Sequence, residues 1–275
     1  MNRKIKVALL QLDVVEDKQN NIENALLEIE SAAKNGADIV VLPEMFCCQY
    51  SNKYFAEFAE EEGGYIWQAM QKAALENKVY LIAGSMPEKE DDRIYNTCFA
   101  FDRNGLQIGK HRKIHLFDIN VSGGQSFCES ATFSKGDSIT IIETEFCKIG
   151  ICICFDMRFP ELSRIMALEG AQMIITPAAF NMTTGPAHWE ILFRQRAVDN
   201  QLFTIGVSTA RNEKSDYVSY GNSIAVSPWG DILYKAGDKK DTSIIKIDLN
   251  KVQQVRSELP LLFARRTDLY DIRRK

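Results

Sequence analysis

The sequence predicts an α/β fold with mixed sheets. Apolar, β-branched stretches recur along the 275 residues and alternate with amphipathic helical patterns, an order typical of layered α/β domains. The turn Asp102-Arg103-Asn104-Gly105 contains the Asn-Gly pair favoured in β-hairpins, so the sheets are not purely parallel. No linker, low-complexity stretch or solenoid repeat divides the chain. We therefore expect residues 1–275 to form a single domain.

The strands are predicted from short apolar stretches. Residues 38–43 are apolar on both faces, as in a fully buried strand, and Pro43 ends that strand because proline cannot continue a central ladder. A further strand begins at Leu106 and runs into a basic cluster. The other strands are predicted at residues 5–12, 79–84, 96–102, 139–142, 148–153, 172–177, 202–209, 222–227 and 243–248.

The helices are predicted from amphipathic periodicity and capping residues. The first helix, at residues 20–35, has polar capping candidates at Asn20 and Asn21. Gly36 stands where the C-terminal cap of this helix belongs. The other helices are predicted at residues 64–77, 160–170 and 187–200.

Composition excludes several classes of protein. A net charge of −4 argues against non-specific nucleic-acid binding. No apolar run approaches the roughly 18 residues of a membrane span, and the apolar stretch at the start is too short for a signal peptide. Seven cysteines, an odd number without disulfide-like spacing, indicate a reducing cytosol. We expect a cytoplasmic protein with neither a nucleic-acid nor a membrane partner.

Cys154 stands where a strand-like stretch turns into an amphipathic helical pattern. We expect a side chain at such a corner to be exposed, with backbone N–H groups of the following helix start pointing toward it. The helix dipole there favours a thiolate. These features suit a nucleophile whose reaction passes through an oxyanion. A cysteine in an apolar run is more often part of the core, which is the better interpretation for Cys152.

Glu44 and Lys113 are expected at the ends of two other strands. Glu44 is either a solvated turn residue or a general base whose pKa is raised by burial beside Met45 and Phe46. Lys113 lies in a basic cluster that must mostly face water, as in a solvated charge run or a phosphate site. One lysine at alternating spacing can point inward, where its ammonium lowers the pKa of a thiol and stabilises an oxyanion.

Two other uses of the cysteines are less favoured. Cys47, Cys48, Cys152 and Cys154 could supply four thiolates to a zinc ion, but adjacent cysteines and a one-residue spacer differ from the usual two- to four-residue spacing. His188 could pair with Cys154 as in Cys–His proteases, but its place at a helix start favours a structural hydrogen bond. We predict no metal and no cofactor.

Three segments resemble the signatures of the nitrilase (carbon–nitrogen hydrolase) superfamily in the family's order and spacing: Leu42-Pro43-Glu44, Lys110-His111-Arg112-Lys113-Ile114-His115-Leu116 and Cys152-Ile153-Cys154-Phe155-Asp156-Met157-Arg158-Phe159-Pro160-Glu161. The resemblance covers the whole chain. It implies a four-layer α-β-β-α sandwich with the active site at the carboxyl ends of strands, and a homodimer or higher homo-oligomer. We expect the apolar C-terminal tail, about residues 255–275, to pack on a partner subunit.

Within that superfamily the chain is most similar to omega-amidases. The similarity is dense at residues 113–119, 127–130, 179–190 and 196–201, whereas Met45, Cys47 and Cys48 depart from the pattern. The resemblance implies a small-molecule amide substrate, 2-oxoglutaramate or 2-oxosuccinamate, hydrolysed to the 2-oxo acid and ammonia. The alternatives are a deaminated glutathione amidase, an N-carbamoyl amine amidohydrolase, a nitrilase or a non-catalytic binding protein on the same fold.

The implied mechanism uses a thioester and no cofactor. Glu44 takes the proton of Cys154, the sulfur attacks the amide carbon, and Lys113 and the backbone N–H of Phe155 hold the oxyanion. Glu44 then protonates the leaving ammonia and activates the water that breaks the thioester. The resemblance matches Glu129 to a second active-site glutamate that orients Lys113 and the substrate. Otherwise Glu129 is a surface acid in a Gly/Ser-rich loop.

The substrate pocket is less clear from the sequence. A charged 2-oxo acid needs a counter-charge or several hydrogen-bond donors. Candidates near the signatures are Tyr50, Phe117, Phe155, Arg158, Phe180, Asn181 and Thr183. The aromatic residues could equally be core, and Arg158 could form a structural ion pair.

Overall fold

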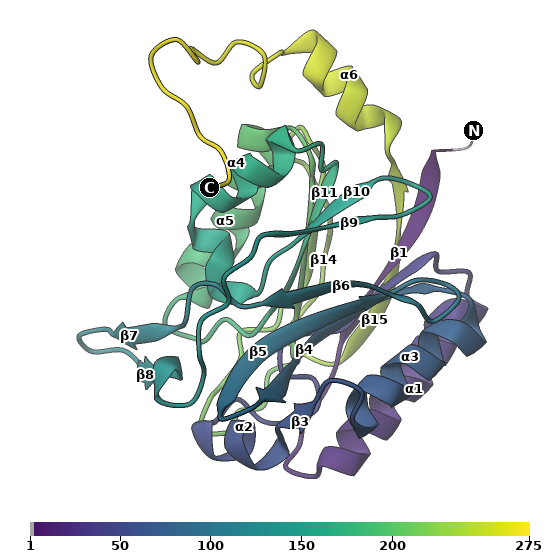
Figure 1. Ribbon diagram of the computed structural model, residues 1–275, viewed down its shortest axis with the longest axis vertical. Helices are drawn as coiled ribbons and strands as arrows, with labels where there is room; N and C mark the ends of the chain where they lie inside the picture. Colours follow the sequence, from purple (N-terminus) through teal and green to yellow (C-terminus); the bar gives the residue numbers. More distant parts are fainter. Residues whose placement is uncertain (1–2) are drawn as a thin grey trace.

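Two mixed β-sheets packed face to face form the centre of the protein (Figure 1). The computed structural model describes residues 3–275. The first sheet has seven strands, in the order β15 (Asp241–Asp248), β1 (Lys4–Gln11), β2 (Ile39–Val41), β4 (Tyr80–Glu90), β5 (Arg93–Phe101) and β6 (Gln107–Arg112), with β3 (Glu60–Glu61) beside β4. β2 pairs in parallel with β1 and β4, whereas β1–β15, β4–β5 and β5–β6 are antiparallel.

The second sheet has six strands and also mixes the two directions. Its order is β14 (Ile232–Lys235), β13 (Ile224–Val226), β12 (Phe203–Ser208), β11 (Met173–Ala178), β10 (Lys148–Ile151) and β9 (Thr140–Glu143). β11 pairs in parallel with β10 and β12, and the outer pairs are antiparallel. A separate hairpin, β7 (Asp118–Asn120) and β8 (Ser126–Cys128), projects from the side of the sandwich (Figure 1).

Helices cover the outer face of each sheet and complete four layers (Figure 1). α1 (Lys18–Lys34) and α3 (Tyr65–Asn77) contact the first sheet, and α4 (Pro160–Leu168) and α5 (Gly185–Asn200) contact the second. The remaining helices are α2 (Asn52–Phe58), α6 (Asn250–Glu258) and the 3-10 helices η1 (Glu129–Ala131) and η2 (Cys154–Arg158). The predicted α-β-β-α sandwich with mixed sheets is confirmed.

The alternating side chains of β1 show why its sequence is apolar on both faces. Val7 and Leu9 belong to the core shared with the second sheet, whereas Ala8 and Leu10 belong to the core beneath α1 and α3. All four are fully buried. A strand in the middle of a layered sandwich therefore needs apolar residues at every position.

Every strand and helix predicted from the sequence is present. The start of α1 differs from the prediction, because Asp17 is the N-cap and its side chain accepts a hydrogen bond from the Asn20 N–H. Gly36 and Gly105 have positive φ, as expected for a helix end and an Asn-Gly turn. The sequence patterns missed α2, α6, β3, β7, β8 and β14. These elements are short or, like α6 with only Val252 and Val255 buried, have too few apolar positions to give a periodic signal.

After α6 the chain returns toward α4 as an extended tail (Figure 1). Several of its apolar side chains are exposed, Phe263 with 91% of its surface and Leu269 with 71%. Within residues 3–275, no helix is long and apolar enough to cross a membrane.

Candidate active site

Glu44, Lys113 and Cys154 follow the carboxyl ends of β2, β6 and β10. The face-to-face packing of the sheets brings these ends together at one edge of the sandwich. The segment before Glu44 lies tightly against β4, because a Cβ on Gly84 would lie only 2.0 Å from the Leu42 carbonyl oxygen. Glycine at this position therefore allows the close approach that places Glu44.

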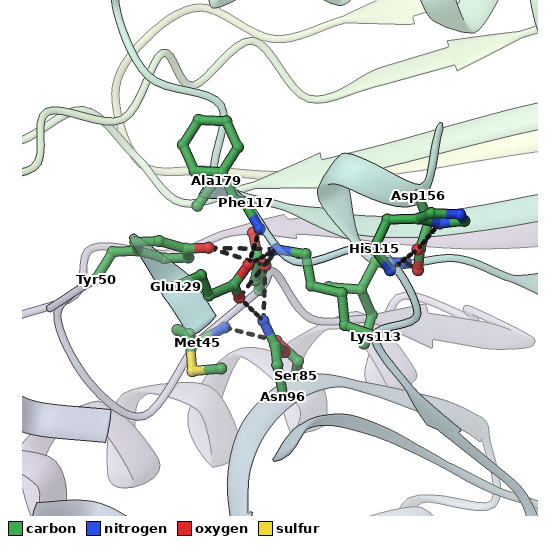
Figure 2. Close-up of polar contacts among 12 residues, drawn as sticks. Met45, Tyr50, Ser85, Asn96, Lys113, His115, Phe117, Glu129, Asp156 and Ala179 are labelled. Carbon is green, nitrogen blue, oxygen red and sulfur yellow. Dashed lines mark hydrogen bonds and ion pairs between the residues drawn. The ribbon is translucent and has the colours of Figure 1, made fainter. Parts of the chain in front are cut away.

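Lys113 lies between two carboxylates in a fully buried cluster (Figure 2). Its Nζ is 2.8 Å from Glu44 Oε1 and 2.9 Å from Glu129 Oε2. Asn96 Nδ2 donates to Oε1 of both glutamates, at 2.9 Å each. The Phe117 N–H donates to Glu129 Oε2 at 2.5 Å. Glu129 is therefore a buried partner of Lys113 rather than a surface acid.

The electrostatics of the cluster keep Lys113 charged and make Glu44 a weaker acid than usual. Burial raises the pKa of Glu44, the Lys113 charge opposes this, and the Glu129 charge adds to the increase, with a net rise. Burial alone would lower the pKa of Lys113, but Glu129 and Glu44 outweigh it and raise that pKa. Among the described residues, buried Glu44 Oε2 has no hydrogen-bond partner within normal geometry, so this oxygen is free to take a proton.

Cys154 differs from the prediction in exposure and in ionisation. It is buried, with 3% of its surface exposed, and its φ is +43°. Burial and then the Glu44 charge raise the pKa of its thiol well above the usual value, although Lys113 and the Ala179 backbone lower it. The predicted exposure of this side chain is therefore wrong, and burial disfavours the thiolate. The sequence locates the corner but not the packing of η2 against β11, α4 and α5 that covers it.

Three residues of the site were not found from the sequence. Asn96 lies on β5 and bridges the two glutamates. Ala179 follows β11, and a hydrogen bond with its backbone lowers the pKa of the Cys154 thiol. Tyr217 donates a hydrogen bond to the Ala179 carbonyl at 2.5 Å, and its ring lies 4.5 Å from that of Tyr50. No local pattern marks these residues, because each reaches the site through the pairing of distant segments.

Several of the predicted substrate-binding residues lie around the cluster. The Tyr50 hydroxyl is 3.3 Å from Lys113 Nζ and 3.5 Å from Glu44 Oε1. Phe117, whose backbone binds Glu129, packs edge-to-face on Phe155, with ring centroids 5.3 Å apart. Of these three residues, only Tyr50 contacts the buried cluster through its side chain.

Arg158 lies over two aromatic rings rather than in an ion pair. Its guanidinium is 4.8 Å from the centre of the Phe180 ring and 5.5 Å from that of Phe155. Nη1 donates to Nδ1 of exposed His188 at 3.0 Å, and Nε is buried without a partner among the described residues. The His188 ring is therefore hydrogen-bonded to Arg158 rather than to Cys154. The Cys–His alternative is therefore not formed.

Asn181 and Thr183 are engaged with neighbouring backbone. Asn181 Oδ1 accepts from the N–H and the hydroxyl of Thr184, both at 2.9 Å, which caps the approach to α5. Its buried Nδ2 has no partner in the part of the chain that the structure describes. Thr183 Oγ1 accepts from the Gln125 N–H at 3.1 Å and so holds the β7–β8 hairpin. No contact of either residue reaches the lysine cluster directly.

The four cysteines of the zinc alternative do not converge. Cys47 and Cys48 are buried in the core beneath α1 and α3, whereas Cys152 and Cys154 belong to the core between and behind the sheets. Across residues 3–275, no group of His, Cys, Asp and Glu side chains has the arrangement of a metal site.

A small cavity of about 20 Å³ lies beside Glu44. Its lining includes Tyr50, Ala179, Tyr217 and the hydroxyl-bearing Thr209 and Ser219. A polar cavity of this size is large enough for one water molecule.

Comparison with known proteins identifies the family. The model of the carbon–nitrogen hydrolase family matches residues 6–257. The chain belongs to this family. The omega-amidase NIT2 of Mus musculus is 46% identical over 270 residues, covering 98% of each chain.

Solved structures of nitrilase-superfamily proteins have the same fold. Saccharomyces cerevisiae Nit3, a member of branch 10 of the nitrilase superfamily, superposes with a TM-score of 0.87 at 39% identity over 96% of each chain. The C. elegans NitFhit protein superposes with a TM-score of 0.91 at 29% identity, over 98% of this chain and 66% of that one. The family assignment and the resemblance read from the three signatures agree.

Proposed function

We propose that this hydrolase is an omega-amidase that hydrolyses the terminal amide of 2-oxoglutaramate or 2-oxosuccinamate. The observation that carries the proposal is the buried Lys113, which forms ion pairs with Glu44 and Glu129. The Cys154 thiol is hydrogen-bonded to the Glu44 carboxylate in the same cluster. A thiol, a base with a free oxygen and a fixed cation are the groups that acyl transfer through a thioester requires. The omega-amidase relatives, similar over the whole chain, support this substrate class.

In the acylation step, proton transfer accompanies sulfur attack, because burial disfavours the free thiolate. Glu44 Oε2 takes the proton of Cys154 while Sγ bonds to the amide carbon. Lys113 and the backbone N–H of Phe155 stabilise the resulting oxyanion. When the tetrahedral intermediate collapses, Glu44 returns the proton to the leaving nitrogen, so ammonia departs and a thioester remains.

In the deacylation step, Glu44 acts on a water molecule. The cavity beside Glu44 is large enough to hold that water. Glu44 removes a proton from the water as its oxygen attacks the thioester carbon. The proton then passes to the Cys154 sulfur, which restores the thiol and releases the 2-oxo acid. Every group in this cycle belongs to the chain or the substrate, so the mechanism needs no cofactor.

Ammonia release from a panel of amides tests the substrate assignment. The panel contains 2-oxoglutaramate, 2-oxosuccinamate, deaminated glutathione, N-carbamoylputrescine, glutamine and a simple nitrile. Fastest release from the 2-oxo amides is expected. Faster release from another member would keep the hydrolase chemistry and reject the omega-amide substrates. No release from any member would favour the non-catalytic binding protein.

Arg158 is proposed to bind the substrate carboxylate, because its guanidinium is partly desolvated and has a buried N–H without a protein partner. Replacing Arg158 with methionine is expected to raise KM for 2-oxoglutaramate about tenfold or more, as for the loss of one charge-assisted hydrogen bond. For a neutral amide of similar length, KM is expected to change less than about threefold. Arg158→Lys, which keeps the charge but not the planar fork, serves as the control. An equal KM increase for both substrates would contradict this role.

The raised pKa of Glu44 predicts an acidic limb in the pH profile. Glu44 must be ionised to accept the thiol proton, so kcat/KM falls as the pH drops through its pKa. The midpoint is expected above the pKa of an unperturbed glutamate. The measurement is kcat/KM for 2-oxoglutaramate and for a neutral amide between about pH 4 and pH 8. A midpoint at or below the ordinary carboxyl range, or a limb seen only with the charged substrate, would contradict the assignment.

We also propose that residues 1–275 act as one hydrolase domain in a cytoplasmic homodimer or higher homo-oligomer. The exposed apolar residues of the tail support a role in subunit contact. All seven cysteines are free, as expected in a reducing compartment. Light scattering of the full chain measures the oligomeric state.

A further inference from the structure

The turn that carries Cys154 has an unfavourable backbone conformation. Cys154 has a φ of +43°, in the left-handed region that residues other than glycine rarely adopt. Such a conformation persists only where the surrounding structure holds it. The turn is closed on one side by the backbone, because the Asp156 N–H donates to the Ile153 carbonyl at 3.0 Å.

The side chain of Asp156 closes the same turn and also reaches the segment of Lys113. Asp156 Oδ2 accepts from the Ile153 N–H at 3.1 Å and contacts His111 Nε2 at 3.0 Å. Oδ1 accepts from the His115 backbone N–H at 2.9 Å and from its ring Nδ1 at 2.8 Å. The carboxylate is fully buried, and its pKa is held well below the usual range because these hydrogen bonds outweigh the effect of burial.

His111 and His115 stand two residues before and two residues after Lys113. Lys113 extends toward Glu129 and Tyr50, while His115 of the same segment is bonded to Asp156 (Figure 2). The His115 ring also stacks on Phe159, with centroids 3.6 Å apart and planes at 10°. One carboxylate thus connects both flanks of the lysine segment to the turn of the nucleophile.

We propose that Asp156, together with His111 and His115, positions Cys154 relative to Lys113 for the reaction. Neither histidine touches the buried lysine–glutamate cluster, so all three are positioning residues. In this arrangement the oxyanion donor and the attacking sulfur keep their spacing through both chemical steps. The inference rests on the proposed hydrolysis, because it assigns these residues to the same reaction.

The two histidines allow matched tests in which a donor is kept or removed. An asparagine Nδ2 occupies nearly the place of histidine Nδ1, so His115→Asn keeps the donor to Asp156, while His115→Leu removes it. In the same way, His111→Gln keeps a donor at the Nε2 position and His111→Met removes it. Asp156→Asn is a third variant, but loss of a buried charge with four hydrogen-bond contacts can prevent folding.

For each folded variant we would measure kcat and KM for 2-oxoglutaramate and the rate of Cys154 alkylation by iodoacetamide. Alkylation of exposed Cys128 in the same sample serves as the internal reference. His115→Leu and His111→Met are expected to lower kcat and the Cys154 alkylation rate about tenfold or more, because small displacements of reacting groups cost large factors in rate. KM is expected to stay within about twofold, and the Asn and Gln variants within about threefold of wild type in all three quantities.

The outcomes separate positioning from a structural role. If the donor-free variants lose thermal stability but keep kcat and alkylation per folded molecule, the cluster only stabilises the fold and the proposal is overturned. Equal losses in His115→Asn and His115→Leu would also overturn it, because stacking on Phe159 rather than the hydrogen bond would then matter. If wild type releases no ammonia but the alkylation contrast persists, the proposed function fails while the positioning role stands.

Discussion

Replacing Cys154 with alanine is expected to lower ammonia release by roughly a million-fold, as for removal of the nucleophile in other covalent mechanisms. Without sulfur no thioester can form, and the remaining Lys113 and Glu44 only polarise the substrate. The fold is expected to remain, because alanine experiences the same backbone strain at φ +43° as cysteine and the thiol makes few polar contacts. The unfolding free energy is therefore expected to change by about 1 kcal/mol or less. Steady-state ammonia assays and urea unfolding measure the two quantities.

Cys128→Ser is the matched control for Cys154→Ala. Cys128 is the exposed cysteine, and its sulfur contacts the hydroxyl of Ser130 at 3.4 Å. Serine preserves that polar contact, so turnover is expected within about twofold of wild type. Intact mass spectrometry during turnover should detect an acyl adduct in wild type and in this control but not in Cys154→Ala. Substantial turnover by Cys154→Ala would reject the thioester mechanism.

The strand ends that carry the site could be predicted from local patterns. Pro43 stops β2 just before Glu44, and the apolar stretch of β10 runs into the polar turn of Cys154. Which strand ends meet depends on strand order, and the order β15-β1-β2-β4-β5-β6 has no local signal. The expectation that Glu44, Lys113 and Cys154 are neighbours therefore came from the resemblance of three signatures to a known family.

The environment of those side chains was harder to predict than their identity. In the sequence, Asn96 has no feature that distinguishes it from other strand residues. It donates hydrogen bonds to both glutamates because β5 pairs with β4 and β6. The exposure of Cys154 was predicted wrongly, and a helix start and a nearby lysine favour a thiolate only while water can reach the sulfur. Packing of η2 and the Glu44 charge reverse that preference. Burial is a property of the whole fold, so local patterns do not report it.

The same burial makes Lys113 important for stability as well as for chemistry. Its ammonium lies 2.8 Å from one fully buried carboxylate and 2.9 Å from another. Removing one partner of a buried ion pair lowers the unfolding free energy more than replacing both partners by apolar residues. The reason is that the remaining charge stays buried without compensation. Here two carboxylates would be left close together, sharing only the amide of Asn96.

Replacing Lys113 with methionine is therefore expected to abolish activity and to lower the unfolding free energy by about 3–5 kcal/mol at neutral pH. Loss of the cation raises the pKa of Glu44 further, because the Lys113 charge no longer lowers it while burial and the Glu129 charge still raise it. A carboxyl group whose pKa is raised by folding destabilises the fold as the pH rises through that pKa. The destabilisation is thus expected to be larger at about pH 8 than at about pH 5, measured by urea unfolding at both.

The double variant Lys113→Met/Glu129→Gln is the control that identifies the cause. It removes one of the two carboxylates and keeps one acceptor oxygen. That oxygen can accept from Asn96 or from the Phe117 N–H but not from both, because these donors bond different oxygens of Glu129. If charge repulsion and desolvation cause the loss, the double variant should be more stable at high pH than Lys113→Met alone, even though it differs from wild type at one more buried position. Equal destabilisation of both variants at both pH values would instead point to lost packing of the lysine stem. In that case Lys113 would contribute packing volume rather than charge compensation.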